Sequence, residues 1–216
     1  MGTDNGDFSP SSVPVPCPLI YNRSDAMNKT DTNLRHALDG EAHASIRYRA
    51  FAKQADTEGY AGVARLFRAA AVSEKIHAKS HQHVLQAEDQ IIADLDSEKK
   101  IAIAIVQLES EGGIKTTAEN LKAALDGETE EFQRMYPAMI RDAVEENALD
   151  ARYSLEYAMS IEMVHAKLFK KASRDLDSVQ TPVYHICPVC GHTVENQPPK
   201  KCPYCGVDSQ KFISVD

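Results

Sequence analysis

Residues 74–79 read Glu-Lys-Ile-His-Ala-Lys, and residues 162–167 read Glu-Met-Val-His-Ala-Lys. A second segment, Ala-Leu-Asp-Gly-Glu, occurs at 37–41 and again at 124–128. The two copies lie 87 residues apart for the pentapeptide and 88 residues apart for the Glu-x-x-His segment. Each half of the repeat thus carries the same segments in the same order. We therefore expect two helical hairpins that pack as pseudo-symmetric halves of one bundle.

Helix signals surround the repeat. From Asp31 onward, apolar residues recur at helical spacing in a background of Ala, Leu, Glu, Lys and Arg. A turn signal at 58–62 separates the first two helices. A capping box at 116–119 begins a third long helix, in which Pro137 predicts a bend or local break. A fourth helix follows Asn147. These signals predict a mainly α fold.

The connection between the halves, residues 88–115, is too long for a tight turn and suits a crossover along the bundle. A short helix is expected within it, from Glu98 to Leu108. The predicted organisation has three parts: a disordered arm rich in Pro and Ser at 1–29, a four-helix bundle at 30–178, and a small cysteine-bearing domain at 179–216.

The repeated glutamates are predicted to lie in one layer of the bundle. Glu41 lies 18 residues before the turn at Gly59 and Glu74 lies 15 residues after it, so both are about 25 Å from the turn at about 1.5 Å per residue. The same counting from Asn147 places the other two glutamates at that level. Each histidine of the repeat follows its glutamate by three residues and shares its helix face. The layer consists of Glu41, Glu74, Glu128, Glu162, His77 and His165.

A buried layer of carboxylates is unfavourable unless cations compensate it, because like charges repel and each loses its hydration. Oxygen and imidazole ligands on inward helix faces suit two iron or manganese ions, and the arrangement matches ferritin-like di-iron bundles. A single helical Glu is usually a solvated residue, but a repeated set is not. The remaining helical histidines have no repeat partners and are interpreted as ordinary surface or core residues: His36, His43, His81 and His83.

The C-terminal segment carries a second metal motif. Two Cys-Pro-x-Cys-Gly sequences lie at 187–191 and 202–206, and eleven residues separate Cys190 from Cys202. Each forms a knuckle whose Gly permits the turn, so tetrahedral coordination by four cysteines is expected. The ligands are Cys187, Cys190, Cys202 and Cys205. Ligand chemistry alone leaves open whether the metal is zinc or a single iron.

Composition limits the environment and the partners. The chain has 24 Lys and Arg against 32 Asp and Glu, a formal net charge of -8, which argues against nucleic acid and anionic membranes as partners. The longest apolar run, 101–106, is too short to span a bilayer. The N-terminus lacks the features of a secretory signal. We expect a cytoplasmic protein whose thiols, apart from the unpaired Cys17, are free for metal.

With these motifs taken together, the sequence resembles the rubrerythrin family over Asp31 to Val215. The matching pieces are Gly40-Glu41, the two Glu-x-x-His segments, residues 127–137 and both cysteine knuckles. The resemblance implies a ferritin-like four-helix bundle with a long crossover, followed by a small β-rich rubredoxin-like domain.

The resemblance also implies residue roles. Glu41, Glu74, Glu128, Glu162 and His165 would be iron ligands, and Glu131 and His77 would alternate on one iron as its oxidation state changes. Two iron ions would occupy the bundle, and one iron (or zinc, as isolated) the four-cysteine site. Tyr48 and Tyr136 would donate hydrogen bonds to ligand carboxylates. Spacing alone fits these two residues equally well as ordinary core tyrosines.

The implied activity is that of a non-haem peroxidase in oxidative-stress defence, which reduces hydrogen peroxide to water. Electrons would arrive through the four-cysteine iron from a separate NAD(P)H-linked reductase or a rubredoxin. A homodimer, head-to-tail, or a larger homo-oligomer is expected. Two rival interpretations remain: a ferroxidase or iron-storage protein, and a non-catalytic helical module with a structural zinc ribbon. The four-cysteine domain argues against the first and the repeated ligand set against the second.

Overall fold

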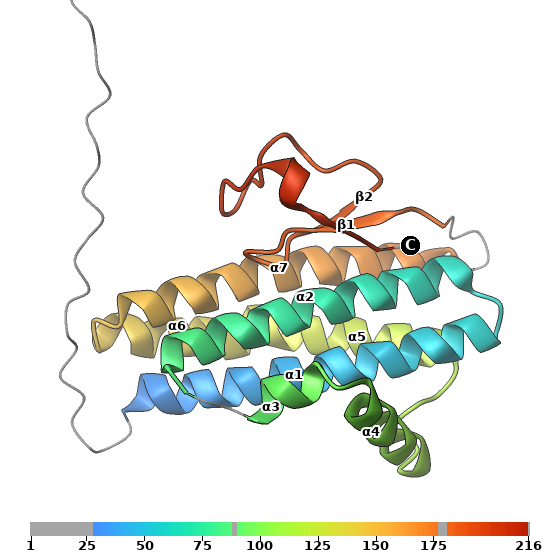
Figure 1. Ribbon diagram of the computed structural model, residues 1–216, viewed down its shortest axis with the longest axis horizontal. Helices are drawn as coiled ribbons and strands as arrows, with labels where there is room; N and C mark the ends of the chain where they lie inside the picture. The colour runs from blue at the N-terminus through green and yellow to red at the C-terminus, as the bar shows by residue number, and fades with distance from the viewer. Residues whose placement is uncertain (1–27, 88–89, 177–180, 216) are drawn as a thin grey trace, which may run out of the picture.

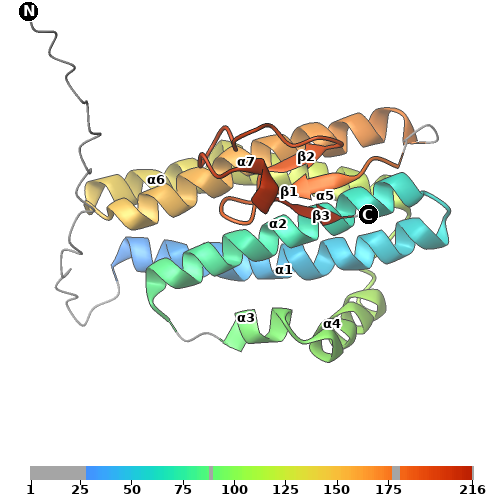
Figure 2. The same cartoon turned by 45° about the horizontal axis from the view of Figure 1, so that its top comes forward.

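The computed structural model describes residues 28–87, 90–176 and 181–215. Four long helical rods lie side by side, and a small sheet covers one face of them (Figures 1 and 2). The rods are α1 (Lys29–Thr57), α2 (Ala61–Leu85), a third made of α5 (Thr117–Glu130), a π-helical turn (Glu131–Met135) and α6 (Tyr136–Glu145), and α7 (Leu149–Arg174). The predicted mainly α bundle is confirmed.

The turns between rods lie where the sequence predicts them. Gly59 has a φ of 87°, and the Tyr60 amide donates to the Ala55 carbonyl at 2.8 Å, which closes the α1–α2 hairpin. Asn147, with a φ of 56°, ends α6 in the left-handed region that Asn tolerates. At the start of α5, Thr116 and Glu119 form the predicted capping box.

Helix α1 begins slightly earlier than predicted. Asn28 caps it by accepting a hydrogen bond from the Asp31 amide, so residues 28–29 belong to the bundle rather than to the arm. The rest of the predicted arm, with Cys17, lies outside the described residues. The crossover contains the predicted helix as α4 (Glu98–Ser110) and an additional short one, α3 (Gln90–Leu95).

The break predicted at Pro137 takes the form of the π-helical turn just before it. Proline lacks an amide hydrogen, and its ring would clash with the carbonyl four residues earlier, which a wider turn avoids. The turn also absorbs one extra residue: Tyr48 follows Glu41 by seven positions, whereas Tyr136 follows Glu128 by eight. At about 100° per residue, eight regular positions would rotate about 80° past two turns. The π turn brings Tyr136 back to the face of Glu128.

Two apolar clusters enclose the middle of the bundle. Toward the α1–α2 turn, Phe51, Phe67 and Phe169 pack with ring centroids 5.4 Å apart for both pairs that involve Phe67. Toward the other end, a second cluster includes Leu38 and Leu155. Each long helix contributes to both clusters or to the segment between them. The repeated glutamates therefore lie between two dry layers, where uncompensated charge is costly.

The C-terminal domain is a three-stranded antiparallel sheet in the order β2-β1-β3, formed by β1 (Tyr184–Ile186), β2 (Thr193–Glu195) and β3 (Ile213–Val215). This is the small β-rich domain that the sequence predicts. It lies on α2 and α7 of the same chain (Figure 2). Arg65 of α2 donates to the Thr181 carbonyl at 2.7 Å, which fixes the chain as it enters the domain.

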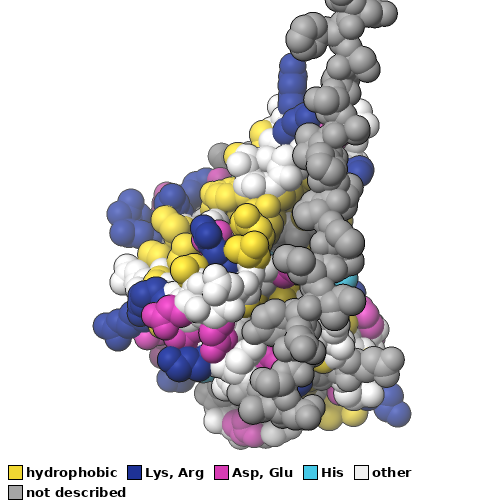
Figure 3. All heavy atoms as spheres, turned by 90° about the vertical axis from the view of Figure 1, so that its left-hand side faces the viewer, with side chains coloured by type: hydrophobic (Ala, Val, Ile, Leu, Met, Phe, Trp, Pro, Cys, Tyr) yellow, Lys and Arg dark blue, Asp and Glu magenta, His cyan; other side chains and the backbone are white. Residues whose placement is uncertain are grey.

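The surface carries charges of both signs. Figure 3 looks onto the end of the bundle where α6 meets α7, and basic and acidic side chains are interspersed there with hydrophobic ones. Exposed apolar residues at this end include Val144 and Leu149. In the described part of the chain, no helix combines the length and the apolar character that crossing a membrane requires.

Candidate metal centres

The repeated glutamates and histidines meet in one buried layer, and none of the six is more than 2% exposed. His77 Nδ1 lies 3.0 Å from Glu74 and 2.9 Å from Glu162. His165 Nδ1 lies 3.1 Å and 2.8 Å from the other carboxylate oxygens of the same two glutamates. Glu74 and Glu162 therefore each offer one oxygen to either side of the layer, as bridging ligands do.

The ligand atoms form two groups, each within 4.8 Å: Glu41, Glu74, His77 and Glu162 on one side, and Glu74, Glu128, Glu162 and His165 on the other. Both oxygens of Glu74 and of Glu162 and the Nδ1 atoms of both histidines are buried without a hydrogen-bond partner. Such orphaned polar atoms are rare in folded proteins unless an ion satisfies them. Carboxylate oxygen and imidazole nitrogen suit iron or manganese. The residues fit a pair of metal ions.

The pKa values of the buried glutamates reflect how closely their carboxyl groups are packed. Burial raises the pKa of Glu41 to about 7, and burial together with neighbouring carboxylates raises the pKa of Glu131 and of Glu162 well above the usual range. Burial also acts on Glu74, but His165 and His77 beside it outweigh burial and lower the pKa of that carboxyl. Bound cations would relieve the repulsion that these shifts reflect.

Both predicted tyrosines reach the layer, each across to the opposite half of the repeat. The Tyr48 hydroxyl donates to Glu128 at 2.5 Å, and the Tyr136 hydroxyl donates to Glu41. Burial and the nearby carboxylates raise the pKa of both tyrosines well above 10, so both keep their protons. Each tyrosine thus holds one outer carboxylate in place.

Glu131 is not brought into either group of ligand atoms. It is the first residue of the π turn and is half-buried, whereas His77 points into the layer. The structure therefore has His77, and not Glu131, beside the bridging glutamates.

The four cysteines form the second cluster. Cys187 and Cys205 have sulfurs 3.4 Å apart, and those of Cys190 and Cys202 are 3.5 Å apart. A tetrahedron with metal–sulfur bonds of about 2.3 Å has sulfurs about 3.8 Å apart, so the cluster fits one tetrahedral ion. In each knuckle the Gly amide donates to the first Cys carbonyl at 2.9 Å.

The glutamate and histidine layer is in contact with the four-cysteine domain through the first knuckle and through Thr193, which follows it. His77 Nε2 donates to the Cys190 carbonyl and His165 Nε2 donates to the Thr193 hydroxyl, both at 3.2 Å. With Nε2 carrying the hydrogen, the Nδ1 lone pair of each ring points into the metal layer. Ser73 donates to the Gly191 carbonyl at 2.8 Å and completes the contact. Sequence reasoning missed Ser73 and Thr193, because no periodicity or motif relates the two domains.

Gly191 is expected to be essential for this contact. Its φ is 75°, and a Cβ atom there would lie 2.5 Å from His77 Nε2. Gly206, in the other knuckle, has a φ of 77° but open space around it. Both Gly→Ala variants share a backbone strain of about 1–2 kcal/mol, and only Gly191→Ala adds the clash.

We expect Gly191→Ala, and not Gly206→Ala, to loosen the C-terminal domain from the bundle. Proteolysis rates between the bundle and the domain, measured with the four-cysteine site loaded, would check this. Equal rates in the two variants would contradict it.

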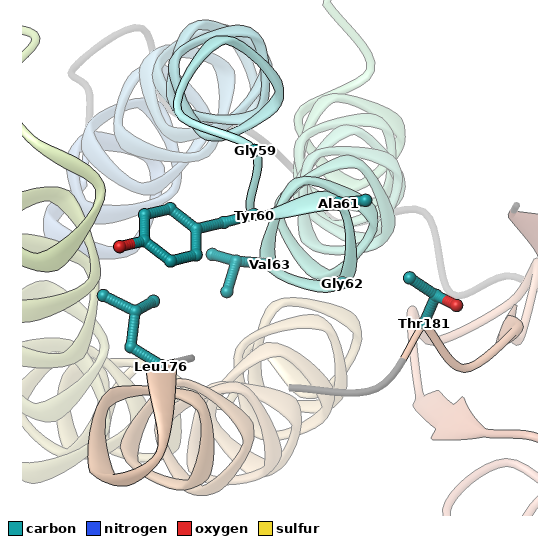
Figure 4. Close-up of a pocket in the computed structure, with 7 residues that line it drawn as sticks. All are labelled: Gly59, Tyr60, Ala61, Gly62, Val63, Leu176 and Thr181. Atoms are coloured by element: carbon teal, nitrogen blue, oxygen red, sulfur yellow. The ribbon is translucent and has the colours of Figure 1, made fainter. Parts of the chain in front are cut away.

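The pocket in Figure 4 is a different feature. It has a volume of about 140 Å³ and lies between the α1–α2 turn and Leu176 and Thr181. Its lining contains no carboxylate, histidine or cysteine. It contributes nothing to metal binding.

A four-helix bundle with a buried layer of four glutamates and two histidines, joined to a four-cysteine domain, defines a ferritin-like di-metal protein with a rubredoxin-like domain. Comparisons with known proteins agree. A family model described as Rubrerythrin matches residues 32–173, and one described as Rubrerythrin, rubredoxin-like domain matches residues 185–213. The chain belongs to the rubrerythrin family.

Individual relatives support this assignment. Rubrerythrin-2 of Clostridium acetobutylicum is 35% identical over 83% of this chain and 92% of its own length. Nigerythrin of Nitratidesulfovibrio vulgaris is 33% identical over 87% of each chain. A solved structure of fully reduced, all-ferrous nigerythrin aligns with a TM-score of 0.70 at 28% identity and covers 94% of this chain and 100% of that one. The buried layer and the cysteine cluster are the di-iron site and the four-cysteine site of this family.

Proposed function

We propose that this protein reduces hydrogen peroxide to water at the di-iron site and receives electrons through an iron held by the four cysteines. Members of the rubrerythrin family are oxidoreductases. The proposed iron ligands are the layer glutamates and histidines, with Glu131 as an exchanging ligand. When bound, the iron pair supplies the two electrons that convert one peroxide into two waters.

One observation carries this proposal: the hydrogen bond from His77 to the Cys190 carbonyl. Cys190 is a proposed ligand of the electron-transfer iron, and His77 is a proposed ligand of the iron pair. A short connection of covalent bonds and one hydrogen bond therefore joins the two sites. A structural zinc ribbon would function without a hydrogen bond to His77, and iron storage would not require the four-cysteine domain. We therefore favour the peroxidase over both rivals.

The protein's side chains would bind the metal ions, keep the carboxylates oriented and supply protons. Glu74 and Glu162 would hold both metal ions, while Tyr48 and Tyr136 keep the outer carboxylates oriented. Each tyrosine also carries a hydroxyl proton beside the site where peroxide oxygens are reduced. The apolar clusters on either side exclude water, which strengthens these interactions. An external NAD(P)H-linked reductase or a rubredoxin would restore the electrons.

The contact between the domains occurs within one chain in this structure. A head-to-tail homodimer, in which the domain of one subunit would serve its partner, remains our prediction for the assembly.

The proposal is tested by reacting the anaerobically reduced, iron-loaded protein with one equivalent of peroxide or of oxygen. We expect peroxide to oxidise the iron pair at least about tenfold faster than oxygen does, and the four-cysteine iron to colour the protein red in its ferric form. A colourless protein with one zinc, or continued oxidation of excess Fe²⁺ by oxygen, would contradict the proposal and favour a rival.

A further inference from the structure

His81 of α2 is a fully buried histidine outside the metal layer. Its Nδ1 lies 2.9 Å from the Ser154 hydroxyl, and its Nε2 lies 3.3 Å from the Tyr136 hydroxyl. Ser154 is in turn 2.7 Å from the hydroxyl of Ser80, which is half-buried at the bundle surface. Because Tyr136 donates to Glu41, one continuous chain of hydrogen bonds links the surface to the metal layer.

Chemistry fixes the direction of every bond in this chain. A metal-binding carboxylate only accepts, so Tyr136 uses its hydrogen on Glu41 and must accept from His81 Nε2. Burial lowers the pKa of His81 to about 3, so the ring is neutral and its Nδ1 has no hydrogen. Nδ1 therefore accepts from Ser154, which accepts from Ser80. Each donor points toward the metal layer.

The other half of the repeat lacks this chain. At the 88-residue offset that relates His77 to His165, the counterpart of His81 is Phe169 and the counterpart of Ser154 is Leu66. Both counterparts are buried in the apolar cluster, where Phe169 packs 5.4 Å from the ring of Tyr48. A polar path is thus built at one of two equivalent positions, although apolar residues satisfy packing at the other.

We propose that Ser80, Ser154 and His81 form a proton relay that delivers protons from water through Tyr136 to the oxygens of the reduced peroxide. The relay rests on the proposed peroxidase function. Reduction of one peroxide to two waters consumes two electrons, from the iron pair, and two protons. His81 acts through Tyr136 and is a positioning residue rather than a catalytic one.

Each passage moves one proton. The Tyr136 O–H bond breaks as its proton passes along the hydrogen bond to Glu41 and from that carboxylate to the departing oxygen, and the Nε2 proton of His81 replaces it. The Ser154 proton then binds Nδ1, the Ser80 proton replaces that of Ser154, and water restores Ser80. His81 then carries its hydrogen on Nδ1, and proton exchange at the two ring nitrogens, by way of the imidazolium, restores the starting tautomer. No side chain keeps a changed charge at the end.

The first experiment compares His81→Gln with His83→Gln. Glutamine at 81 can still donate to Tyr136 and accept from Ser154, but its amide does not pass a proton on. His83 is exposed on the same helix and provides the matched control. We expect His81→Gln to bind two irons and unfold at the wild-type temperature, yet oxidise its iron pair with peroxide about 10²-fold more slowly and with an altered solvent deuterium isotope effect.

Ser154→Ala should show the same defect, and the double variant should be no slower than either single one, since both break one path. His81→Phe, which copies the residue of the other half, should also be slow. A wild-type rate and isotope effect in His81→Gln would overturn the relay. Failure of the wild-type iron pair to react with peroxide would instead overturn the proposed function, and the relay with it.

A second measurement needs no turnover. In the zinc-loaded protein, ¹⁵N NMR of the histidine rings should show His81 neutral at pH 7, with hydrogen on Nε2. The Ser154→Ala substitution should strongly shift the Nδ1 resonance of His81 and leave its Nε2 resonance nearly unchanged. An imidazolium, or hydrogen on Nδ1, would overturn the proposed direction of the chain.

Discussion

Replacing Glu74 by alanine should abolish the iron pair and reduce peroxide turnover by more than about 100-fold, while the helices stay folded. Glu74 belongs to both groups of ligand atoms, so its loss removes an oxygen from each metal position at once. Removing one buried carboxylate also lessens repulsion in the metal-free layer, which favours folding. Iron analysis, peroxide consumption and far-UV circular dichroism measure the three expectations.

Two further variants make this test specific. Glu41→Ala removes a ligand from one group only, so it should retain more iron than Glu74→Ala. Glu130 lies two residues from Glu128, but its carboxylate is exposed and pairs with Arg134. The Glu130→Ala variant should therefore behave as the wild type. Two bound irons and full peroxidase activity in Glu74→Ala would refute the ligand assignment.

Much of the metal layer could be predicted because a helix has a constant rise. Counting residues from the turns at Gly59 and Asn147 places four glutamates at one level, and the structure brings them together there. The π turn was also visible in the sequence, although only as a shift of the repeat offset from 87 for the Glu41–Glu128 pair to 88 for the Tyr48–Tyr136 pair. That shift locates one inserted residue before Tyr136.

The contacts made by the four-cysteine domain could not be predicted in this way. His77 and the Cys190 carbonyl are 113 residues apart, and their contact depends on how two separately patterned domains pack. His81 was interpreted as an ordinary histidine because it has no partner in the repeat. The absence of a partner was itself informative, since it marks where one half departs from the other. Helix periodicity identifies the shared features of the halves, but only the structure shows what their differences do.

Replacing Cys190 by serine should separate one peroxide turnover from repeated turnover. The variant loses one of four sulfur ligands, and with it the iron proposed as the electron entry, but the backbone carbonyl that accepts from His77 is retained. The prereduced iron pair should therefore react once with peroxide at close to the wild-type rate. Steady-state turnover with a reductase should fall by more than about 100-fold, since re-reduction has lost its route. Stopped-flow absorbance and a coupled NAD(P)H assay measure the two rates.

Cys202→Ser provides the matched variant, because Cys202 belongs to the same sulfur cluster but lies in the second knuckle. Equal loss of steady-state turnover in both variants would show that the metal carries the electrons. A loss confined to Cys190→Ser would show instead that the knuckle acts by holding His77. Undiminished steady-state turnover in both would exclude the four-cysteine site as the electron entry, because neither variant can retain a complete tetrahedral thiolate centre.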